Sequence, residues 1–448
     1  MTSACGGDRK EGAPAAGNAA GGAAAGQVER GGTAILAELA DMDKPVPFIF
    51  DTSLDGDLSD IMYMPLLRGV WRDGKLVFLT SHDSPMSLAW HWEYVGADST
   101  AIRYRMRSGL KWSDGEPITA QDVVWTYGMI KDPRVASPRQ DYVERMDSVT
   151  AENDSTVVFY FKDRYPDMLF HSGLPIAPKH AFQGVDPAQI RSSPRVVNPG
   201  NGNMVVSGPF MIGQWSKGER IVLVPNPRFP IRPNLDQIVI RVIPEATTRL
   251  VEFQTGRVDF VRPIPFEQIP ALRSQAPNVR FEKEQKRFYD YVGYNPKAFA
   301  PFADKDIRLA LGLAVDVPAI LRALQMQEYT VPAGGPYSPI FSDLYDPRQQ
   351  APLTYDTARA KQILASKGWR DTNGDGVLDK DGKPFQFTLL TNAGNQRRAD
   401  VSQILQQQWK RIGVDARLQQ LETNTVFDRL RKKNFEANLM GWGVGLSP

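Results

Sequence analysis

The chain has 448 residues, more than one compact core usually holds, so we expect it to divide into two or three lobes. Its 42% apolar and 23% charged residues are typical of a folded globular protein, and no apolar run approaches the roughly 18 residues of a membrane-spanning helix. A formal net charge of +2, with basic and acidic residues interspersed, excludes the basic surface that nucleic-acid binding requires.

Cysteine usage is informative near the N-terminus. Cys5 is the only cysteine, which excludes internal disulfides and thiolate metal sites, and it follows three small residues as in a bacterial lipoprotein signal. Residues 12–26 contain eight Ala and five Gly, a composition that cannot bury a core. We therefore interpret residues 1–30 as a signal remnant, a lipid-anchor cysteine and a flexible tether. The alternative is an unpaired cysteine in a disordered tail.

Ordered sequence is expected from about residue 31, with a first strand over residues 33–39. Residues 51–70 carry the turn-like sequence DGD at 55–57 and then an apolar group, which predicts a loop leading into a short buried helix. Short strands are predicted at residues 76–79, 102–106 and 156–161, with a helix over residues 120–130 among them.

Residues 107–127, RSGLKWSDGEPITAQDVVWTY, combine a strand end, a turn and a capped helix. Asp114 and Gly115 supply turn chemistry, and Thr119 and Asp122 have the spacing of a capping pair before an apolar run. This stretch resembles the signature of the extracellular solute-binding proteins of the peptide and nickel class. Those proteins are the receptors of oligopeptide ABC importers.

Further matches to this family follow in the same order along the chain. They are LPIAPKH at residues 174–180, SGPF at 207–210, VPNP at 224–227, PNLD at 233–236, YVGYN at 291–295, DIRLAL at 306–311 and LMGWG at 439–443. Asp356 is predicted to cap a helix, and apolar residues from 401 to 412 predict another, followed by a strand from residue 414. Collinearity over this length is more specific than any single motif.

The resemblance implies an α/β fold like that of periplasmic binding proteins of class II type, with an extra inserted lobe. Lobe I is expected over residues 31–55 and 175–262, the inserted lobe II over residues 56–174, and lobe III over residues 263–448. In the family the chain continues beyond the position of Pro448 and completes lobe I. We therefore expect the C-terminal end of lobe I to be missing here and an apolar face to remain uncovered.

The motifs also imply where a ligand binds. The strand ending in GWG faces the ligand in the family, and the asparagine that ends the YVGYN strand is a further match. The implied ligand-binding residues are Gly441, Trp442, Gly443, Asn295 and Tyr294. For Trp442, burial beneath the strand is the alternative. In peptide-binding members an aspartate three residues after this tryptophan pairs with the α-amino group of the ligand, but Gly445 occupies that position here.

The sequence predicts neither catalysis nor a cofactor. It lacks the nucleophile-elbow, metalloprotease, phosphate-loop and dinucleotide-binding motifs. The four histidines are far apart in sequence, which favours surface or packing roles over a metal site: His82, His91, His171 and His180. We therefore expect a protein that is not an enzyme.

One loop has partial metal-site character. Asp371, Asn373, Asp375 and Asp379 lie at alternating positions, as in the first nine residues of a calcium loop. The twelfth position requires a bidentate glutamate, and Gly382 stands there instead. We therefore favour a polar turn over a calcium site, and no metal is expected.

The resemblance implies the substrate-binding component of an ABC importer, anchored by lipid in the periplasm or at the cell surface. Such a monomer closes on a peptide or a related small solute and presents it to permease and ATPase subunits. The alternatives are a secreted hydrolase and a binding protein for a nickel chelate, an opine or an oligosaccharide.

Overall fold

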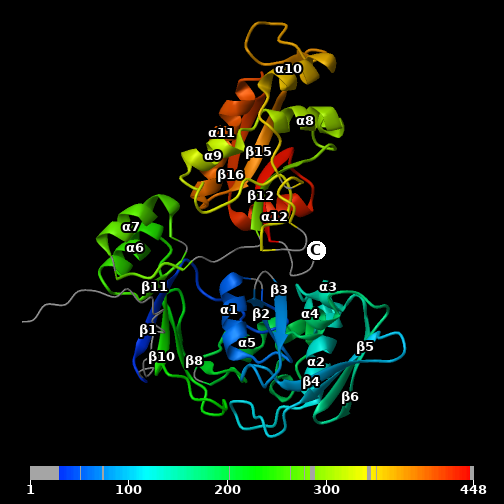
Figure 1. Cartoon of the computed structure of the whole chain (residues 1–448), viewed down its shortest axis with the longest axis vertical. Coiled ribbons are helices and arrows are strands. Elements are labelled where there is room, and N and C mark those ends of the chain that lie inside the picture. Colours follow the sequence, from blue (N-terminus) through cyan, green and yellow to red (C-terminus); the bar gives the residue numbers. More distant parts are fainter. Residues whose placement is uncertain are drawn as a thin grey trace, which may run out of the picture.

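The computed structural model describes residues 30–443, apart from residues 51, 73–74, 201, 263, 277, 283–287, 341–344 and 350. Figure 1 shows two bodies, a lower one coloured blue to green and an upper one coloured yellow-green to red. Both bodies combine helices with sheets, which confirms the predicted α/β fold class.

The lower body is built from eleven strands and seven α-helices of the described residues. The strands are β1 (Thr33–Glu38), β2 (Arg68–Arg72), β3 (Lys75–Leu79), β4 (Ala89–Val95), β5 (Ala101–Met106), β6 (Met146–Asn153), β7 (Thr156–Phe161), β8 (Phe210–Ser216), β9 (Arg220–Pro225), β10 (Gln237–Val242) and β11 (Phe260–Val261). The helices are α1 (Ser53–Met62), α2 (Ala120–Lys131), α3 (Gln140–Val143), α4 (Met168–Ser172), α5 (Pro194–Val197), α6 (Ala246–Gln254) and α7 (Ile269–Gln275).

These strands form two larger sheets that share one core. The first has the order β11-β1-β10-β9-β8, with β1 parallel to both neighbours, and the second is antiparallel with the order β4-β5-β7-β6. Tyr104 and Phe159 from the second sheet belong to the same buried cluster as Ile221 and Leu223 from the first. Because the buried side chains are continuous, the segments expected as lobes I and II pack as one body.

The predicted capping pair is present and also holds a distant motif. Asp122 is 4% exposed, and its Oδ2 accepts hydrogen bonds from the backbone N of Thr119 at 2.9 Å and from Nε1 of Trp112 at 3.3 Å. Its Oδ1 accepts a bond from the backbone N of Lys179 at 2.9 Å. One buried carboxylate therefore joins the start of α2 to the turn before it and to the LPIAPKH segment.

Gly208 joins two other motifs to α1. Its N donates to the carbonyl of Met62 at 2.7 Å, and a Cβ at this position would lie 2.1 Å from the carbonyl oxygen of Ile61. Its own carbonyl accepts a bond from Nδ2 of Asn226 at 2.8 Å. The SGPF and VPNP motifs thus meet at the end of α1, where only glycine permits the close approach.

The prediction of a loop at residues 55–57 is wrong. The DGD sequence lies inside α1, which begins at Ser53 after the cap Thr52, whose Oγ1 accepts a bond from the N of Asp55 at 3.2 Å. Asp55 is fully buried, and its Oδ1 accepts a bond from the N of Asp43 at 2.8 Å. An acidic residue in the first turn of a helix is favourable, and this tertiary contact overrides the turn propensity.

The upper body is an α/β layer of four main strands, with a small hairpin besides. Its strands are β12 (Phe288–Tyr294), β13 (Asp379–Lys380), β14 (Lys383–Pro384), β15 (Gln386–Asn392), β16 (Asp415–Leu421) and β17 (Ala437–Gly443). Its helices are α8 (Lys305–Leu313), α9 (Val317–Ala323), α10 (Thr357–Ser366), α11 (Gln396–Lys410) and α12 (Thr423–Arg431). The sheet order is β12-β17-β15-β16, and residues of α8, α10 and α11 pack in its main core.

The crossing between the bodies follows α7. Gln254 of α6 donates through Nε2 to Oε1 of Gln275 in α7 at 3.5 Å, and Figure 1 places both helices with the lower body. The crossing therefore lies between α7 and β12, later than the boundary at residue 263 that the resemblance implies. Nearby, the rings of Phe266 and Tyr329 stack between the two bodies, with centroids 5.1 Å apart and planes at 17°.

No helix within the described residues combines the length and the apolar character that crossing a membrane requires.

Candidate functional site

The pairing of β12 with β17 separates the five implied ligand residues into two groups. The strands are antiparallel, with Tyr289 opposite Trp442 and Tyr294 opposite Ala437. The five steps along the strand from Tyr289 to Tyr294 span about 16 Å at roughly 3.3 Å per residue. The GWG segment and the YVGYN strand end therefore lie at opposite ends of the sheet.

The side chains of Asn295 and Tyr294 contact other residues within lobe III. Asn295 is 7% exposed, and its Nδ2 donates to the carbonyls of Lys433 at 2.9 Å and Phe435 at 2.7 Å. The Tyr294 ring lies 4.7 Å from that of Phe302, and burial raises the pKa of its hydroxyl group. Both side chains hold the sheet end to neighbouring segments, and the structure does not bring them to Trp442.

The other end of the sheet exposes aromatic surface. Trp442 is 61% exposed and Phe288 is 39% exposed, so the burial alternative for Trp442 does not hold. A Cβ on Gly441 would lie 2.0 Å from Cζ of Phe288 and 2.3 Å from Nη2 of Arg398. Glycine at this position therefore lets a ring and a guanidinium cross directly over the strand.

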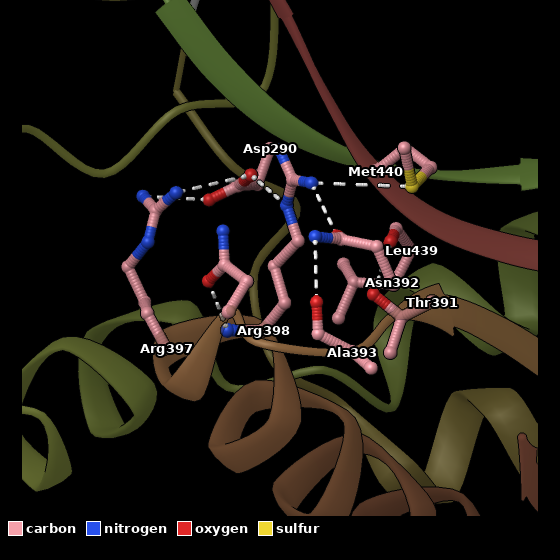
Figure 2. Close-up of polar contacts among 9 residues, drawn as sticks. Asp290, Thr391, Asn392, Ala393, Arg397, Arg398, Leu439 and Met440 are labelled. Carbon is pink, nitrogen blue, oxygen red and sulfur yellow. Dashed lines mark hydrogen bonds and ion pairs between the residues drawn. The ribbon is translucent and has the colours of Figure 1, made fainter. Parts of the chain in front are cut away.

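Two arginines share one carboxylate at this end of the sheet (Figure 2). Nη1 of Arg397 lies 2.7 Å from Oδ2 of Asp290, and Nε of Arg398 donates to Oδ1 of Asp290 at 3.1 Å. Arg398 is 8% exposed and also donates through Nη1 to Oδ1 of Asn392 at 2.7 Å. We call these four residues the Asp290 cluster. Its net charge is +1, and Arg397 carries its most exposed charge, with a side chain that is 34% exposed.

The cluster sits where parallel strands end and a helix begins. β15 ends at Asn392, and Oδ1 of Asn395 caps α11 by accepting a bond from the N of Arg398 at 3.1 Å. β15 pairs with β17 only through Leu389 and Leu390, and Figure 2 shows Arg398 reaching toward β17 beyond that point. Carboxyl ends of parallel strands are the usual place for ligands in α/β sheets.

The acidic side chains of the calcium-like loop form hydrogen bonds with groups of the same loop. The two carboxylate oxygens of Asp371 accept bonds from the N of Gly374 at 2.7 Å and of Gly376 at 2.9 Å. Oδ1 of Asp379 accepts a bond from the Thr372 hydroxyl at 2.6 Å, and this bond lowers the pKa of Asp379. The described part of the chain contains no group of three or more His, Cys, Asp or Glu side chains placed to hold a metal ion.

The described histidines occupy separate environments. His180 pairs with Asp114 through Nε2 at 2.7 Å, on the signature turn. Nδ1 of His171 bonds to the Tyr165 hydroxyl at 2.8 Å, and burial lowers the pKa of His171. Cys5 and Gly445 lie outside the described residues.

A wide hollow lies elsewhere, on the outer face of the five-stranded sheet. Its volume is about 680 Å³, and Ile35, Val239, Arg220 and Arg241 are among its lining residues. The hollow lies across strand faces rather than at strand ends, and we do not assign the ligand to it.

Two α/β bodies joined by a crossing, with an exposed aromatic and charged strand end on one of them, have the architecture of a two-lobed binding protein. The chain belongs to the bacterial extracellular solute-binding proteins, family 5, whose middle region matches residues 86–448. This family comprises binding proteins rather than enzymes.

Comparison with individual relatives agrees with this family. The chain is 33% identical over 356 residues to the oligopeptide-binding protein AppA of Bacillus subtilis, covering 78% of this chain and 64% of AppA. The solved structure of AppA from Bacillus subtilis in complex with a nonapeptide matches with a TM-score of 0.78 at 28% identity, over 94% of this chain and 81% of that one. NikZ from Campylobacter jejuni, in complex with Ni(L-His), shares the fold with a TM-score of 0.77 at 23% identity, over 93% and 78%. The chain thus spans 64% of the length of the curated relative AppA, slightly less than two thirds.

The sequence motifs located Trp442 but not the Asp290 cluster. One signal was available, because Asn392, Asn395, Arg397 and Arg398 form a polar stretch at the junction just before the helix predicted over residues 401–412. A ligand site is common at such a junction in a parallel sheet. No local sequence pattern indicated Asp290 as a site residue, because only strand pairing places it opposite Gly441.

Proposed function

We propose that this chain is the extracytoplasmic substrate-binding component of an ABC importer, which captures a peptide or a related small solute by hinge closure. The observation that carries the proposal is the free edge of β17 beside Trp442. Beyond Asn438, no described strand pairs with the side of β17 that faces β15, and because the Leu439 carbonyl accepts a bond from the Thr391 hydroxyl at 2.8 Å, the free edge begins at Met440. Alternate backbone groups of an antiparallel strand point to that side, so an extended peptide can pair with them.

Main-chain pairing at this edge suits a peptide without a fixed sequence. The exposed rings of Trp442 and Phe288 supply apolar surface for side chains of any type. Asp290 is not available for the α-amino group of a ligand, because Arg397 and Arg398 hold both of its oxygens. We therefore propose recognition through the ligand backbone rather than through a carboxylate at its N-terminus.

Closure of lobe III onto the other two lobes would complete the site. We propose that the ligand stabilises the closed form, which the permease then recognises, with ATPase subunits supplying the energy. Cys5 would carry the lipid anchor and residues 1–30 the tether, which places a monomer in the periplasm or at the cell surface. A Cys5→Ala variant should then leave the membrane fraction.

Recovery of bound material tests the function. Purified protein is incubated with a mixture of synthetic hexapeptides, re-isolated and analysed by mass spectrometry. We expect intact peptides, and a Trp442→Ala variant should bind them roughly tenfold more weakly because a large aromatic surface is lost. Trp90→Ala is the matched control, since Trp90 is also exposed, at 42%, but lies on β4.

Each other outcome has a definite meaning. Cleaved peptides would overturn the proposal in favour of a hydrolase, and recovery of a metal chelate, an opine or a sugar would redirect the ligand class. Equal weakening by the Trp442 and Trp90 substitutions would contradict the location of the site.

A further inference from the structure

A small pocket lies between α2 and β6 in the lower body, and we call it the α2–β6 pocket. Its volume is about 170 Å³. Figure 1 shows α2 and β6 together at the opposite end of the lower body from β1. Three elements supply the apolar side chains of its lining, which are Val124 and Tyr127 of α2, Val143 of α3, and Met146 and Val149 of β6.

One face of α2 forms a wall of the pocket. Four lining residues have the helical spacing i, i+3, i+4 and i+7, which places them on the same face: Val124, Tyr127, Gly128 and Lys131. Tyr127 is 2% exposed and Met146 is 3% exposed, and both belong to the large buried cluster of the lower body. The walls of the pocket are therefore held in place by the packing of the core.

Gly128 keeps the pocket open. Apart from the backbone of the helix itself, a Cβ at this position would have no heavy atom within 4 Å, so no close approach requires glycine here. Glycine inside a helix lowers stability relative to alanine. Because packing gives no reason for this glycine, we look for the reason in access to the pocket, which a side chain at position 128 would restrict.

The polar groups of the lining already have partners or face solvent. Nζ of Lys131 donates to the carbonyls of Met146 at 3.3 Å and Asp147 at 2.8 Å. Asp147 and Ser148 are exposed, so water can hydrate their side chains. Water inside the pocket would find few groups left to bind, whereas an apolar molecule would lose no hydrogen bond there.

We propose that the α2–β6 pocket is a binding site for a small, neutral apolar molecule of about the size of one aromatic ring. In another protein, a dry cavity of about 150 Å³ lined by Leu, Ile and Phe binds benzene, so the volume fits this class of ligand. The ring of Tyr127 and the thioether of Met146 suit an aromatic occupant, because both make favourable contacts with aromatic rings. This site is separate from the free edge of β17, and it does not rest on the proposed function.

Toluene and benzoate test the class of ligand, since each has one aromatic ring and only benzoate is charged. The full chain is labelled with ¹³C at the methionine methyl groups, and the Met146 signal is assigned with Met146→Leu. Toluene should shift this signal in a saturable manner with a Kd of about 1 mM or lower. Benzoate should bind at least roughly tenfold more weakly, because its carboxylate would lose water without gaining a partner.

Substitutions at Gly128 locate the bound toluene. Gly128→Leu places an apolar side chain in the pocket, so toluene should bind at least roughly tenfold more weakly while the melting temperature stays unchanged or rises. Gly128→Ala should weaken binding roughly threefold, because it adds a single methyl group, and it carries the test if the leucine variant does not fold.

Gln121→Leu is the matched control. Gln121 is exposed on α2 seven residues before Gly128, which is about two turns, and it is not part of the lining. Leucine at this position adds the same side chain outside the pocket. Toluene should therefore bind this variant within about twofold of the wild type.

The assignment can fail in three ways. A Met146 signal that does not move with toluene near its solubility limit would overturn the site, and benzoate that binds as tightly as toluene would overturn the class of ligand. A shift that Gly128→Leu leaves unchanged would show that toluene binds elsewhere. Peptide binding is measured separately with the hexapeptide mixture, so a failure of the proposed function would leave these results unaffected.

Discussion

Arg398 and Asp290 are 108 positions apart in the chain, yet Nε of Arg398 donates to Oδ1 of Asp290 at 3.1 Å. The bond joins the first turn of α11 to β12, and the same guanidinium reaches Asn392 at the end of β15. One side chain thus holds three elements of lobe III in place beside the proposed ligand edge.

Removing this guanidinium should destabilise lobe III. Arg398→Met keeps much of the side-chain volume but leaves Asp290 with one cation and Asn392 without its donor, so we expect a loss of about 2 kcal/mol in the free energy of unfolding. Urea titration measures the loss. Arg417→Met, an exposed arginine on β16, is the control and should cost under about 0.5 kcal/mol. Equal effects of the two substitutions would contradict the role of Arg398.

Gly441 should not tolerate a side chain. Gly441→Ala places a methyl group against Phe288 and Arg398, which must shift, at a cost of about 1–3 kcal/mol in the free energy of unfolding. Gly128→Ala is the matched control, because Gly128 lies inside α2 with open space around its missing Cβ. Alanine there should stabilise by about 0.5–1 kcal/mol through higher helix propensity. If the melting temperatures of the Gly441→Ala and Gly128→Ala variants both rose or both fell relative to the wild type, this prediction would be contradicted.

Asp122 should be among the most sensitive positions of the lower body. Asp122→Ala leaves the N–H donors of Trp112, Thr119 and Lys179 without their acceptor, so we expect a loss of about 3 kcal/mol. Asp114→Ala, which removes a half-exposed partner of His180, should cost less than about 1 kcal/mol. Chemical denaturation followed by tryptophan fluorescence checks the ranking, and a reversed order would refute it.

His171 should make stability depend on pH in the mildly acidic range. Burial lowers the pKa of His171 in the folded chain, whereas in the unfolded chain this pKa has its ordinary value of about 6.5. Below about pH 6.5 the unfolded chain therefore binds a proton more readily than the folded chain does. The stabilisation that neutral, buried His171 provides is therefore fully present above about pH 6.5, and it is lost as the pH falls toward the pKa of His171 in the folded chain.

His171→Phe tests this dependence, because phenylalanine preserves the stack on Tyr142, whose ring plane lies at 17° to that of His171, and cannot titrate. We expect melting temperatures of this variant to fall less than those of the wild type between pH 7.5 and pH 5.5. Parallel curves for the two proteins would rule out His171 as the titrating group.

The stack of Phe266 on Tyr329 should favour the arrangement in which the bodies are close. Each ring belongs to a different body, so Tyr329→Ala removes a contact of about 1 kcal/mol and should weaken peptide binding roughly fivefold. Small-angle scattering should show a larger radius of gyration for the variant.

A double-mutant cycle with Phe266→Ala isolates the contact, because the second substitution should add little once the first is made. Additive losses would show that the rings act independently. Tyr160→Ala, an exposed tyrosine on β7, is the control and should leave binding unchanged.

Local patterns in the sequence predicted much of the secondary structure. The helix expected over residues 120–130 is α2, and Asp356 caps α10 as predicted, with Oδ1 accepting a bond from the N of Arg359 at 2.8 Å. Capping and periodicity act within a few residues, so they can be read directly from the sequence. The DGD segment of α1 was misread because a buried contact outweighed its turn propensity.

The sequence by itself determined the α/β class, the family and the position of the GWG segment, because each depends on the order of short motifs along the chain. Only the tertiary structure decided that Asn295 and Tyr294 lie far from Trp442, and that Asp290 meets two arginines beside Gly441. The physical reason is strand register: antiparallel pairing sends the two ends of β12 to opposite ends of the sheet, and long-range pairing of this kind leaves no local pattern in the sequence.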